Sequence, residues 1–249
     1  MALRAVIITA VVLGAIHFPI FCSGQEWSVS PIRLEFASEK ASGVITISNN
    51  SAKRLNCQMK AFRWTQDEEG KDRYTETRDI IFFPRLMVIE PKDRKVIRVG
   101  TKVSASQAEQ TYRLFVEDVT PSQSGEGANV VFAIRFGVPI FLKPFKEKTE
   151  GVIERIAMDK GVIEVTVKNT GNSHFIIQKI TVRAVGPGSE AILSKDLPGW
   201  YLLSGSVKNH TMEIPRESCR KIARVEIEVK TDKFTLKDDL NVQKTMCSR

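Results

Sequence analysis

The sequence has few of the residues, and none of the common motifs, on which enzyme active sites are built. It contains 3 histidines, and beyond the N-terminal segment only His174 and His210 remain, each alone in a segment expected to be a loop. A solitary histidine there is expected to be an ordinary surface residue. The motifs H-E-x-x-H, C-x-x-C and G-x-S-x-G and the P-loop are all absent. The sequence therefore predicts a binding protein rather than an enzyme, with no cofactor and no metal site.

Long apolar runs are also absent, with one exception at the N-terminus. Arg4 precedes an apolar stretch that ends at Cys22, and small residues follow it. This order is typical of a secretory signal peptide, predicted here over residues 1–24, with an uncleaved anchor as the alternative. A lipoprotein signal at Cys22 is disfavoured by the bulky Phe21 before it. Because no other run approaches the roughly 20 residues that span a bilayer, we expect an exported chain without stable membrane anchorage.

Acidic residues are fewer than basic ones, and the formal net charge is +8. The basic side chains are scattered between the apolar residues of strand-like runs, with no basic helix and no aromatic RNA-binding motif. We interpret this excess as a solvated surface, with an acidic protein partner as the alternative and no nucleic acid expected.

Helical periodicity is almost missing, and short alternating runs rich in Val, Ile and Phe take its place. Examples of such runs are Trp27–Phe36, Gly43–Ser48, Asn56–Trp64, Lys95–Gly100, Tyr112–Asp118, Asn129–Lys143, Val162–Lys168, Phe175–Ala184, Arg224–Lys230 and Thr235–Val242. Many short strands separated by turn residues predict an all-β protein made of sandwiches. A charged stretch after Pro144 divides the runs into two sets, so we expect immunoglobulin-like domains over residues 25–145 and 146–249.

Three cysteines remain after the predicted cleavage, and an odd number leaves one of them unpaired. Cys57 lies in an alternating apolar run and is expected to be a buried strand residue. Cys219 and Cys247 bracket the last two predicted strands. Because an exported protein can form disulfides, we predict a Cys219–Cys247 bond and a free Cys57.

One run, from Ala128 to Pro144, is longer than the usual strand of about 5–6 residues. Large apolar residues alternate along one of its faces, namely Val130, Phe132, Ile134, Phe136 and Val138. This face could pack in the core of its own domain, or it could project from an exposed edge and fill a groove of another protein. In the second case the opposite face, which carries Val131, is expected to pack inside.

The order and spacing of several segments resemble the periplasmic pilus-assembly chaperones of the chaperone–usher pathway over nearly the whole mature chain. These segments are Val29–Leu34, Ile47–Asn50, Phe83–Arg85, Ile89–Pro91, Val96–Val99, Tyr112–Glu117 and Val138–Pro144. The resemblance implies two immunoglobulin-like sandwiches in an L or boomerang, in the periplasm of a Gram-negative cell. It also implies two partners, which are pilus subunits (pilins) and the outer-membrane usher that receives them.

The resemblance assigns roles to the long strand and to the cleft beside it. By match, Val130, Phe132 and Ile134, with Phe136 as a further candidate, are donated to the incomplete fold of a pilin. The family grips the C-terminal carboxylate of the subunit with two cations, and Arg33 matches the first of them. The second is usually a lysine five positions before the final proline of the strand, where this chain has Pro139. Arg135, on the same face, and Arg113, on the adjacent strand, are the candidates to replace it.

An ionic network between the domains is a further feature that the resemblance implies. Lys143 matches its cation, Glu109 one acid and Asp232, loosely, the other. Lysine in place of the usual arginine indicates a divergent branch, such as the alternative or archaic systems. The rival hypothesis is a secreted immunoglobulin-like adhesin or a structural pilus subunit, which would polymerise or bind glycans instead of forming a chaperone–subunit complex.

Overall fold

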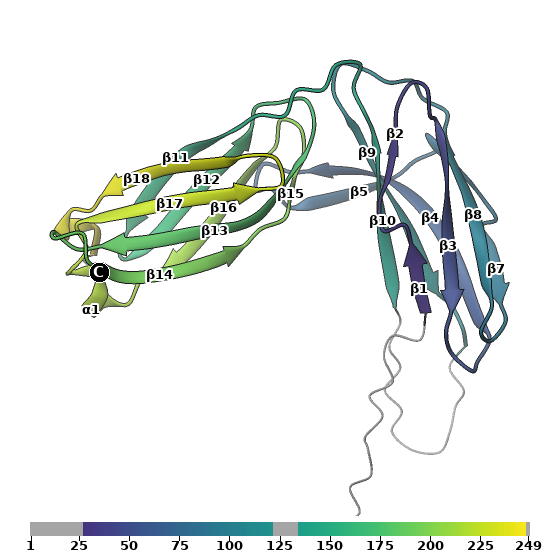
Figure 1. The fold of residues 1–249 in the computed structure, drawn as a ribbon, viewed down its shortest axis with the longest axis horizontal. Coiled ribbons are helices and arrows are strands. Elements are labelled where there is room, and N and C mark those ends of the chain that lie inside the picture. Colours follow the sequence, from purple (N-terminus) through teal and green to yellow (C-terminus); the bar gives the residue numbers. More distant parts are fainter. Residues whose placement is uncertain (1–26, 122–133, 248–249) are drawn as a thin grey trace, which may run out of the picture.

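The computed structural model describes residues 27–121 and 134–247, and strands make up most of it. Figure 1 shows two β-sandwiches that meet at an angle, so the molecule has a bent outline. The predicted class, all-β with two sandwiches in an L-like arrangement, is confirmed. The predicted signal peptide lies outside the described residues. In the described ranges, no helix has both the length and the apolar character needed to cross a bilayer.

The first sandwich packs a sheet in the order β1-β3-β8-β6 against a sheet in the order β2-β10-β9-β4-β5, which β7 joins through β4. Its strands are β1 (Trp27–Ser30), β2 (Leu34–Phe36), β3 (Ser42–Asn49), β4 (Leu55–Gln66), β5 (Asp72–Glu76), β6 (Ile80–Phe83), β7 (Leu86–Ile89), β8 (Arg94–Thr101), β9 (Gln110–Asp118) and β10 (Arg135–Leu142). Strand β10 runs antiparallel to β9 and parallel to β2, so it is paired on both sides.

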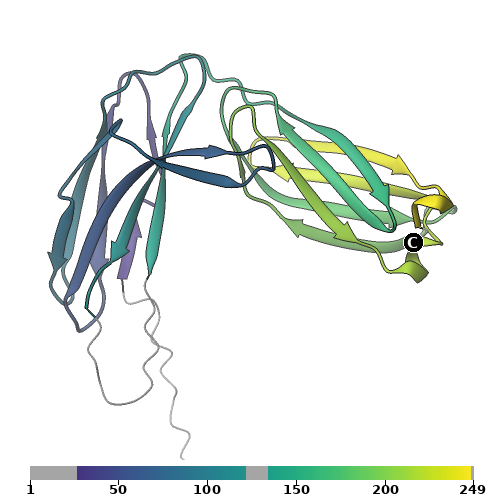
Figure 2. The ribbon, with the colours of Figure 1, turned by 180° about the vertical axis from the view of Figure 1, so that it is seen from behind.

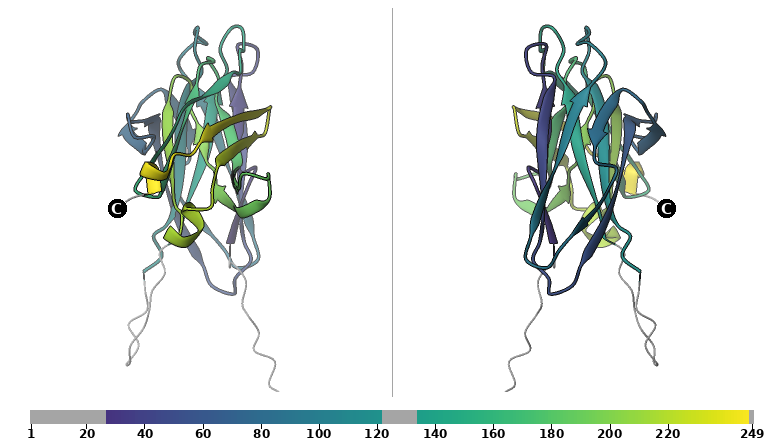
Figure 3. Two further views of the ribbon diagram at one scale, coloured as in Figure 1. Left: turned by 90° about the vertical axis from the view of Figure 1, so that its left-hand side faces the viewer. Right: turned by 90° about the vertical axis from the view of Figure 1, so that its right-hand side faces the viewer.

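The second sandwich packs a sheet in the order β11-β12-β16 against a sheet in the order β14-β13-β17-β18, with β15 paired to β13. Its strands are β11 (Gly151–Asp159), β12 (Val162–Asn169), β13 (Phe175–Val185), β14 (Ala191–Pro198), β15 (Tyr201–Leu202), β16 (Val207–Glu213), β17 (Arg224–Thr231) and β18 (Thr235–Asn241). The helix α1 (Arg216–Cys219) and a 3-10 helix (Lys244–Cys247) lie at the end away from the joint (Figures 1 and 3). The disulfide Cys219–Cys247 joins these two short helices as predicted, while Cys57 is free and buried.

Each sandwich has its own hydrophobic core. Side chains of a strand point alternately to its two faces, and β4 shows the consequence. Leu55, Cys57 and Met59 are buried in the first core, whereas Asn56 and Gln58 between them are only half-buried. Burying one large aliphatic side chain contributes about 1.5–3 kcal/mol, so the alternating residues of such strands account for much of the stability of each sandwich.

The predicted run Trp27–Phe36 is not one strand. Its first part, β1, pairs with β3 in one sheet, and its second part, β2, pairs with β10 in the other. Pro31 stands between the two parts, and proline has no amide hydrogen with which to continue a sheet ladder. The chain therefore changes sheets at this point, which places Arg33 directly beside β10.

Candidate functional site

Strand β10 packs its even-numbered side chains in the first core. Val138 and Ile140 are buried there, and Ile134 and Phe136 are partly buried against the same core. The ring of Phe136 contacts the edge of Trp27, with 4.5 Å between the ring centroids. These contacts leave the odd-numbered side chains on the outer face of the sheet, where Arg135 is exposed.

This arrangement corrects the expectation that the odd-numbered face packs inside. The period of a strand is two, so the burial of Val138 and Ile140 places Ile134 and Phe136 on the core face as well. Of the predicted donor residues, Val130 and Phe132 lie outside the described residues, as does Val131. On the described part of the run, the core face and the predicted donor face are therefore one continuous apolar face.

The strand register brings Arg33, Pro139 and Arg113 into one row. Pro139 pairs with Arg113 across β10 and β9, while Ile140, the next residue of β10, pairs with Leu34 of β2. Arg33 precedes Leu34, so it continues the row on the other side of Pro139. Leu34 and Ile140 are in the core, and the residues next to them in sequence therefore belong to the outer face. The two arginines consequently flank the position where the family has its lysine.

The two arginines of this row have different surroundings. The side chain of Arg33 is 41% exposed, and its Nε lies 3.2 Å from a carboxylate oxygen of Glu35. Arg113 is only 8% exposed. Its Nη1 donates to the backbone oxygen of Gly137 at 3.0 Å, and its guanidinium carbon lies 4.1 Å from the centre of a Trp64 ring. Within the described residues, the buried Nε and Nη2 of Arg113 have no hydrogen-bond partner.

Arg135, the other predicted substitute, lies further along the same face. Its guanidinium stacks over Phe115, 4.2 Å from the ring centroid, and its Nη1 lies 3.3 Å from Glu117. The side chain is 55% exposed. Arg135 and Arg33 are therefore open to a ligand, whereas Arg113 is covered by aromatic rings.

The three residues predicted to form the interdomain ionic network, Lys143, Glu109 and Asp232, contact other residues instead of one another. Lys143 lies 3.0 Å from Glu35 and 3.9 Å from Glu147. Glu109 instead accepts hydrogen bonds from the backbone nitrogen and the Nδ1 of His174, at 2.9 and 2.7 Å. Asp232 accepts from a backbone nitrogen of β13 at 2.7 Å. No ion pair joins these three residues to one another in the described ranges, because Glu35 on β2 stands closer to Lys143 than either predicted acid.

The pKa values at this pair follow from its contacts. The hydrogen bond to Glu35 raises the pKa of Lys143, with further contributions from nearby carboxylates that include Glu109. Burial alone would raise the pKa of Glu35, but the hydrogen bond to Lys143 and the charges of Lys143, Arg33 and His174 together lower it. Both groups are therefore held in their charged forms, and Glu109 contributes to the network through its charge rather than by contact.

The expectation that His174 and His210 are surface residues is wrong. Each is 8% exposed. His174 lies at the joint, stacked on Phe141 with 3.7 Å between the ring centroids. His210 is in β16, and burial lowers its pKa to about 4. The residues around an isolated histidine do not show whether its side chain is buried. The prediction therefore depended only on how often histidines in proteins are exposed.

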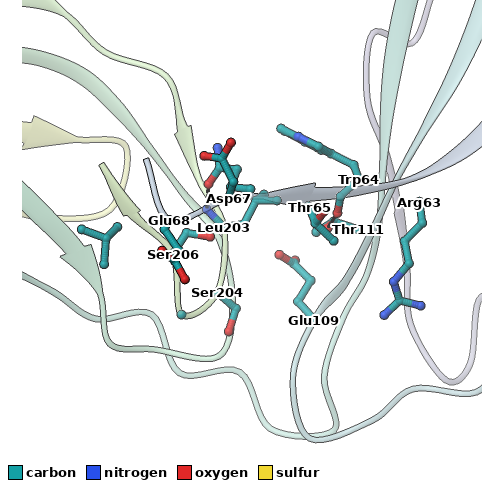
Figure 4. Close-up of a pocket in the computed structure, with 13 residues that line it drawn as sticks. Arg63, Trp64, Thr65, Asp67, Glu68, Glu109, Thr111, Leu203, Ser204 and Ser206 are labelled. Carbon is teal, nitrogen blue, oxygen red and sulfur yellow. Dashed lines mark hydrogen bonds between the residues drawn. The ribbon is translucent and has the colours of Figure 1, made fainter. Parts of the chain in front are cut away.

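A cavity of 540 Å³ lies at the joint (Figure 4). Figure 4 shows Trp64, Thr111 and Glu109 on one side of it and Leu203, Ser204 and Ser206 on the other. Its charged lining residues are Arg63, Asp67, Glu68 and Glu109, so acids outnumber cations. None of the three candidate arginines lines it. This cavity is therefore unsuited to a carboxylate and is distinct from the arginine row.

Comparison with known families connects this geometry to a class of protein. Residues 27–147 match a family described as pili and flagellar-assembly chaperone, PapD N-terminal domain. The first sandwich is therefore a domain of this chaperone family. A search of curated protein sequences found no match.

Solved pilus chaperones have the same fold. The match to the CsuC–CsuE complex of Acinetobacter baumannii has a TM-score of 0.52 and 19% identity, and it covers 74% of this chain and 89% of that chain. CupB2 of Pseudomonas aeruginosa gives 0.54 and 14%, with 87% and 100% covered. The YadV chaperone gives 0.56 and 14%, with 88% and 100% covered. At these identities the likeness establishes the fold of two immunoglobulin-like sandwiches.

Proposed function

We propose that this protein is a periplasmic chaperone that captures pilus subunits by donating the strand around β10, and that it then delivers them to an outer-membrane usher. The observation that carries the proposal is the row of Arg33, Pro139 and Arg113, which places cations on both sides of β10. The chain would be exported by residues 1–24 and act without a cofactor.

The proposed anchor for the subunit is its C-terminal carboxylate. A guanidinium can bind a carboxylate through two parallel hydrogen bonds. Arg33 is the primary anchor in this proposal because it is exposed and, among the described residues, pairs only with Glu35, in a solvent-accessible contact. The two candidates for the second cation differ in access: Arg135 is exposed on the same face, whereas Arg113 is covered and would act through its charge unless the rings over it move.

The proposed donor residues are Val130, Phe132 and Ile134. Phe136, whose ring packs against Trp27 in the first core, is a further candidate. The continuity of the core face with this segment supports the proposal, because a strand that leaves its own core with the same apolar face can complete the core of a partner. Each side chain that enters a pilin groove would contribute about 1.5–3 kcal/mol. Three or four of them would contribute about 4.5–12 kcal/mol, which is of the same order as the cost of association, about 4–15 kcal/mol.

Two of the matched structures support a subunit as the partner. One is a chaperone–tip subunit pre-assembly complex from archaic chaperone–usher Csu pili. Another holds the SafA pilin with the SafB chaperone of Salmonella enterica. The departures at Pro139 and Lys143 lead us to place this chain in a divergent, alternative or archaic-like branch.

The test is co-expression in the periplasm with candidate pilins, followed by purification through a tag on the chaperone. The expected result is a soluble one-to-one complex that the subunit alone does not form. The rival, an adhesin or structural subunit, would instead give homopolymers or glycan binding without any pilin. Recovery of homopolymers and no pilin complex would overturn the proposal.

A further inference from the structure

The hairpin of β4 and β5 leaves the first sandwich and reaches the second on the inner side of the bend (Figures 1 and 2). Gln66, at the end of β4, makes two hydrogen bonds there. Its Nε2 donates to the backbone oxygen of Tyr201 at 2.9 Å, and its Oε1 accepts from the backbone nitrogen of Leu203 at 3.0 Å. One side chain of the first domain thus satisfies both a carbonyl and an amide of the second.

The rest of the hairpin makes further contacts with the second domain. The indole nitrogen of Trp200 donates to Asp72 at 2.9 Å, and Nζ of Lys208 donates to the backbone oxygen of Gly70 at 3.3 Å. Gly70 has a φ of +72°, and a Cβ added to it would lie 2.6 Å from the backbone oxygen of Val207. The tip therefore needs glycine for its conformation and for its close approach.

A third hydrophobic cluster, separate from the cores of the two sandwiches, includes Trp64 of the hairpin strand β4. Trp64 and Phe141 of the first domain are fully buried in it, with Leu203 of the second domain, and Tyr201 packs against them. The rings of Trp64 and Tyr201 contact each other edge to face at 5.3 Å. The hairpin thus takes part, through Trp64, in an apolar contact made by both domains.

A second set of contacts, outside the hairpin, also joins the two domains. The backbone nitrogen of Glu109 donates to the backbone oxygen of Asn172 at 2.8 Å, and the side chain of Asn172 donates to Gln107 at 2.7 Å. A hinge motion between two domains needs a small set of residues that can absorb it. Contacts at two separate places restrict this motion unless one set is released.

We infer that the β4–β5 hairpin is an interdomain brace, in which Gln66, Gly70 and Trp200 fix the angle between the two sandwiches. The default expectation for two domains in one chain is relative motion unless their interface is large and apolar. The brace supplies polar contacts at its tip and an apolar cluster at its base. It acts on the free chain, so the inference does not depend on the identity of any partner.

The brace can be tested by measuring the distance between the domains in the free protein. Nitroxide labels on the exposed Lys53 and Lys195, one in each domain, would report it by electron–electron double resonance. The matched pair of variants is Gly70→Ala and Gly205→Ala. Both glycines have a φ of +72°, but a Cβ on Gly205 meets nothing within 4 Å, whereas one on Gly70 meets the second domain.

The expected result is a single narrow distance distribution for the wild type and for Gly205→Ala. For Gly70→Ala we expect a distribution at least about twofold wider, as for domains that move independently. A second variant, Trp200→Phe, keeps an aromatic ring but removes the indole bond to Asp72, and it should widen the distribution by a smaller amount. Unchanged widths in both Gly70→Ala and Trp200→Phe would overturn the inference and assign the angle to the Asn172 contacts alone.

Discussion

The guanidinium carbon of Arg113 lies 4.1 Å from the centre of a Trp64 ring, in a contact from which water is excluded. Rings of Trp200 and Tyr201, from the other domain, lie 5.6 and 5.8 Å from the same guanidinium. Cation–π attraction of a desolvated arginine contributes about 2 kcal/mol. Against this, buried donors without a partner cost about 1–3 kcal/mol each, and Arg113 has two such nitrogens among the described contacts. The hydrogen bond from Nη1 to Gly137 adds about 1.5–3 kcal/mol, so the favourable terms fall within the range of the unfavourable ones.

The first prediction follows from that near-cancellation. Arg113→Met keeps most of the side-chain volume and removes the buried charge, so the free energy of unfolding should change by no more than about 1 kcal/mol. If Arg113 supplies the second anchoring charge, the same variant should lose subunit capture. Urea unfolding and periplasmic co-purification are the two measurements. A large loss of stability together with normal capture would make Arg113 a structural residue only.

Arg33→Ala should leave the fold intact and weaken subunit capture. Its pair with Glu35 is solvent-accessible, and such pairs contribute about 0–1 kcal/mol to stability. Removing one side of a buried charge pair in the complex should cost about 2–5 kcal/mol of binding. The control is Arg54→Ala, which removes another exposed arginine, paired with Glu90. Equal capture by both variants would exclude Arg33 from the anchor.

Substitutions along the donor segment should separate residues that stabilise the free protein from residues that bind the subunit. Phe136→Asp places a charge against Trp27 in the first core and should lower the melting temperature strongly. Under the proposed function, Phe132→Asp should leave the free protein folded and abolish the subunit complex. Val131→Asp, on the opposite face, should preserve both. Thermal melting of each purified variant beside co-purification measures this, and a strongly lowered melting temperature for Phe132→Asp would contradict the donor assignment.

The cysteines should react differently with an alkylating reagent. Burial, with a smaller contribution from Asp118, raises the pKa of the Cys57 thiol to about 12. Native protein at neutral pH should therefore resist labelling, and labelling should appear on unfolding at Cys57 alone. Replacing Cys219 and Cys247 by serine should lower stability by about 3 kcal/mol, as for other loops of similar length. Mass mapping without reduction gives the pairing, and a bridge to Cys57 would refute it.

His210 should make the second sandwich sensitive to mild acid. Its pKa is lowered to about 4 in the folded state, while in the unfolded chain it returns to about 6.5. Between these values the unfolded chain takes up a proton that the folded one does not. The contribution of neutral His210 to the free energy of unfolding is therefore fully present above about pH 6.5 and is lost as the pH falls toward 4. After allowance for partial exposure, unfolding at pH 5 should be easier by about 1–2 kcal/mol than at pH 7.

The control for this prediction is His210→Gln, which fills similar space without titrating in this range. Urea unfolding of both proteins at pH 7 and pH 5 isolates the contribution of the histidine. The difference between the two pH values should be smaller in the variant. The same difference in both proteins would place the pH dependence elsewhere in the chain.

Several features could be read from the sequence because they depend on neighbours in the chain. The alternation of Leu55, Cys57 and Met59 with polar residues specifies a half-buried strand wherever that strand is placed. The bracketing of the last strands by Cys219 and Cys247 indicated the disulfide in the same way. Several strands were not named from the sequence, among them β5, whose side chains are exposed or half-buried, so that Asp72–Glu76 shows no alternation.

The contacts at the joint could not be read in this way. The sequence argument gave Lys143 two acidic partners, Glu109 and Asp232. In the structure Lys143 lies beside β2 and pairs with Glu35 of that strand instead. Nothing in the sequence indicates that Gln66 and Trp200 make interdomain contacts, because a glutamine at a strand end and a tryptophan in a turn are common. Their role exists only because the β4–β5 hairpin reaches the second sandwich.

By itself, the sequence determined the all-β class, the two sandwiches, the disulfide and the resemblance to pilus chaperones, because each of these depends on the local periodicity and spacing of residues. Only the tertiary structure decided which face of β10 is buried, which arginine is covered and how the domains are joined. The physical reason is that strand pairing is long-range. Arg33, Pro139 and Arg113 are far apart in the chain and become neighbours only through the register of β2, β10 and β9.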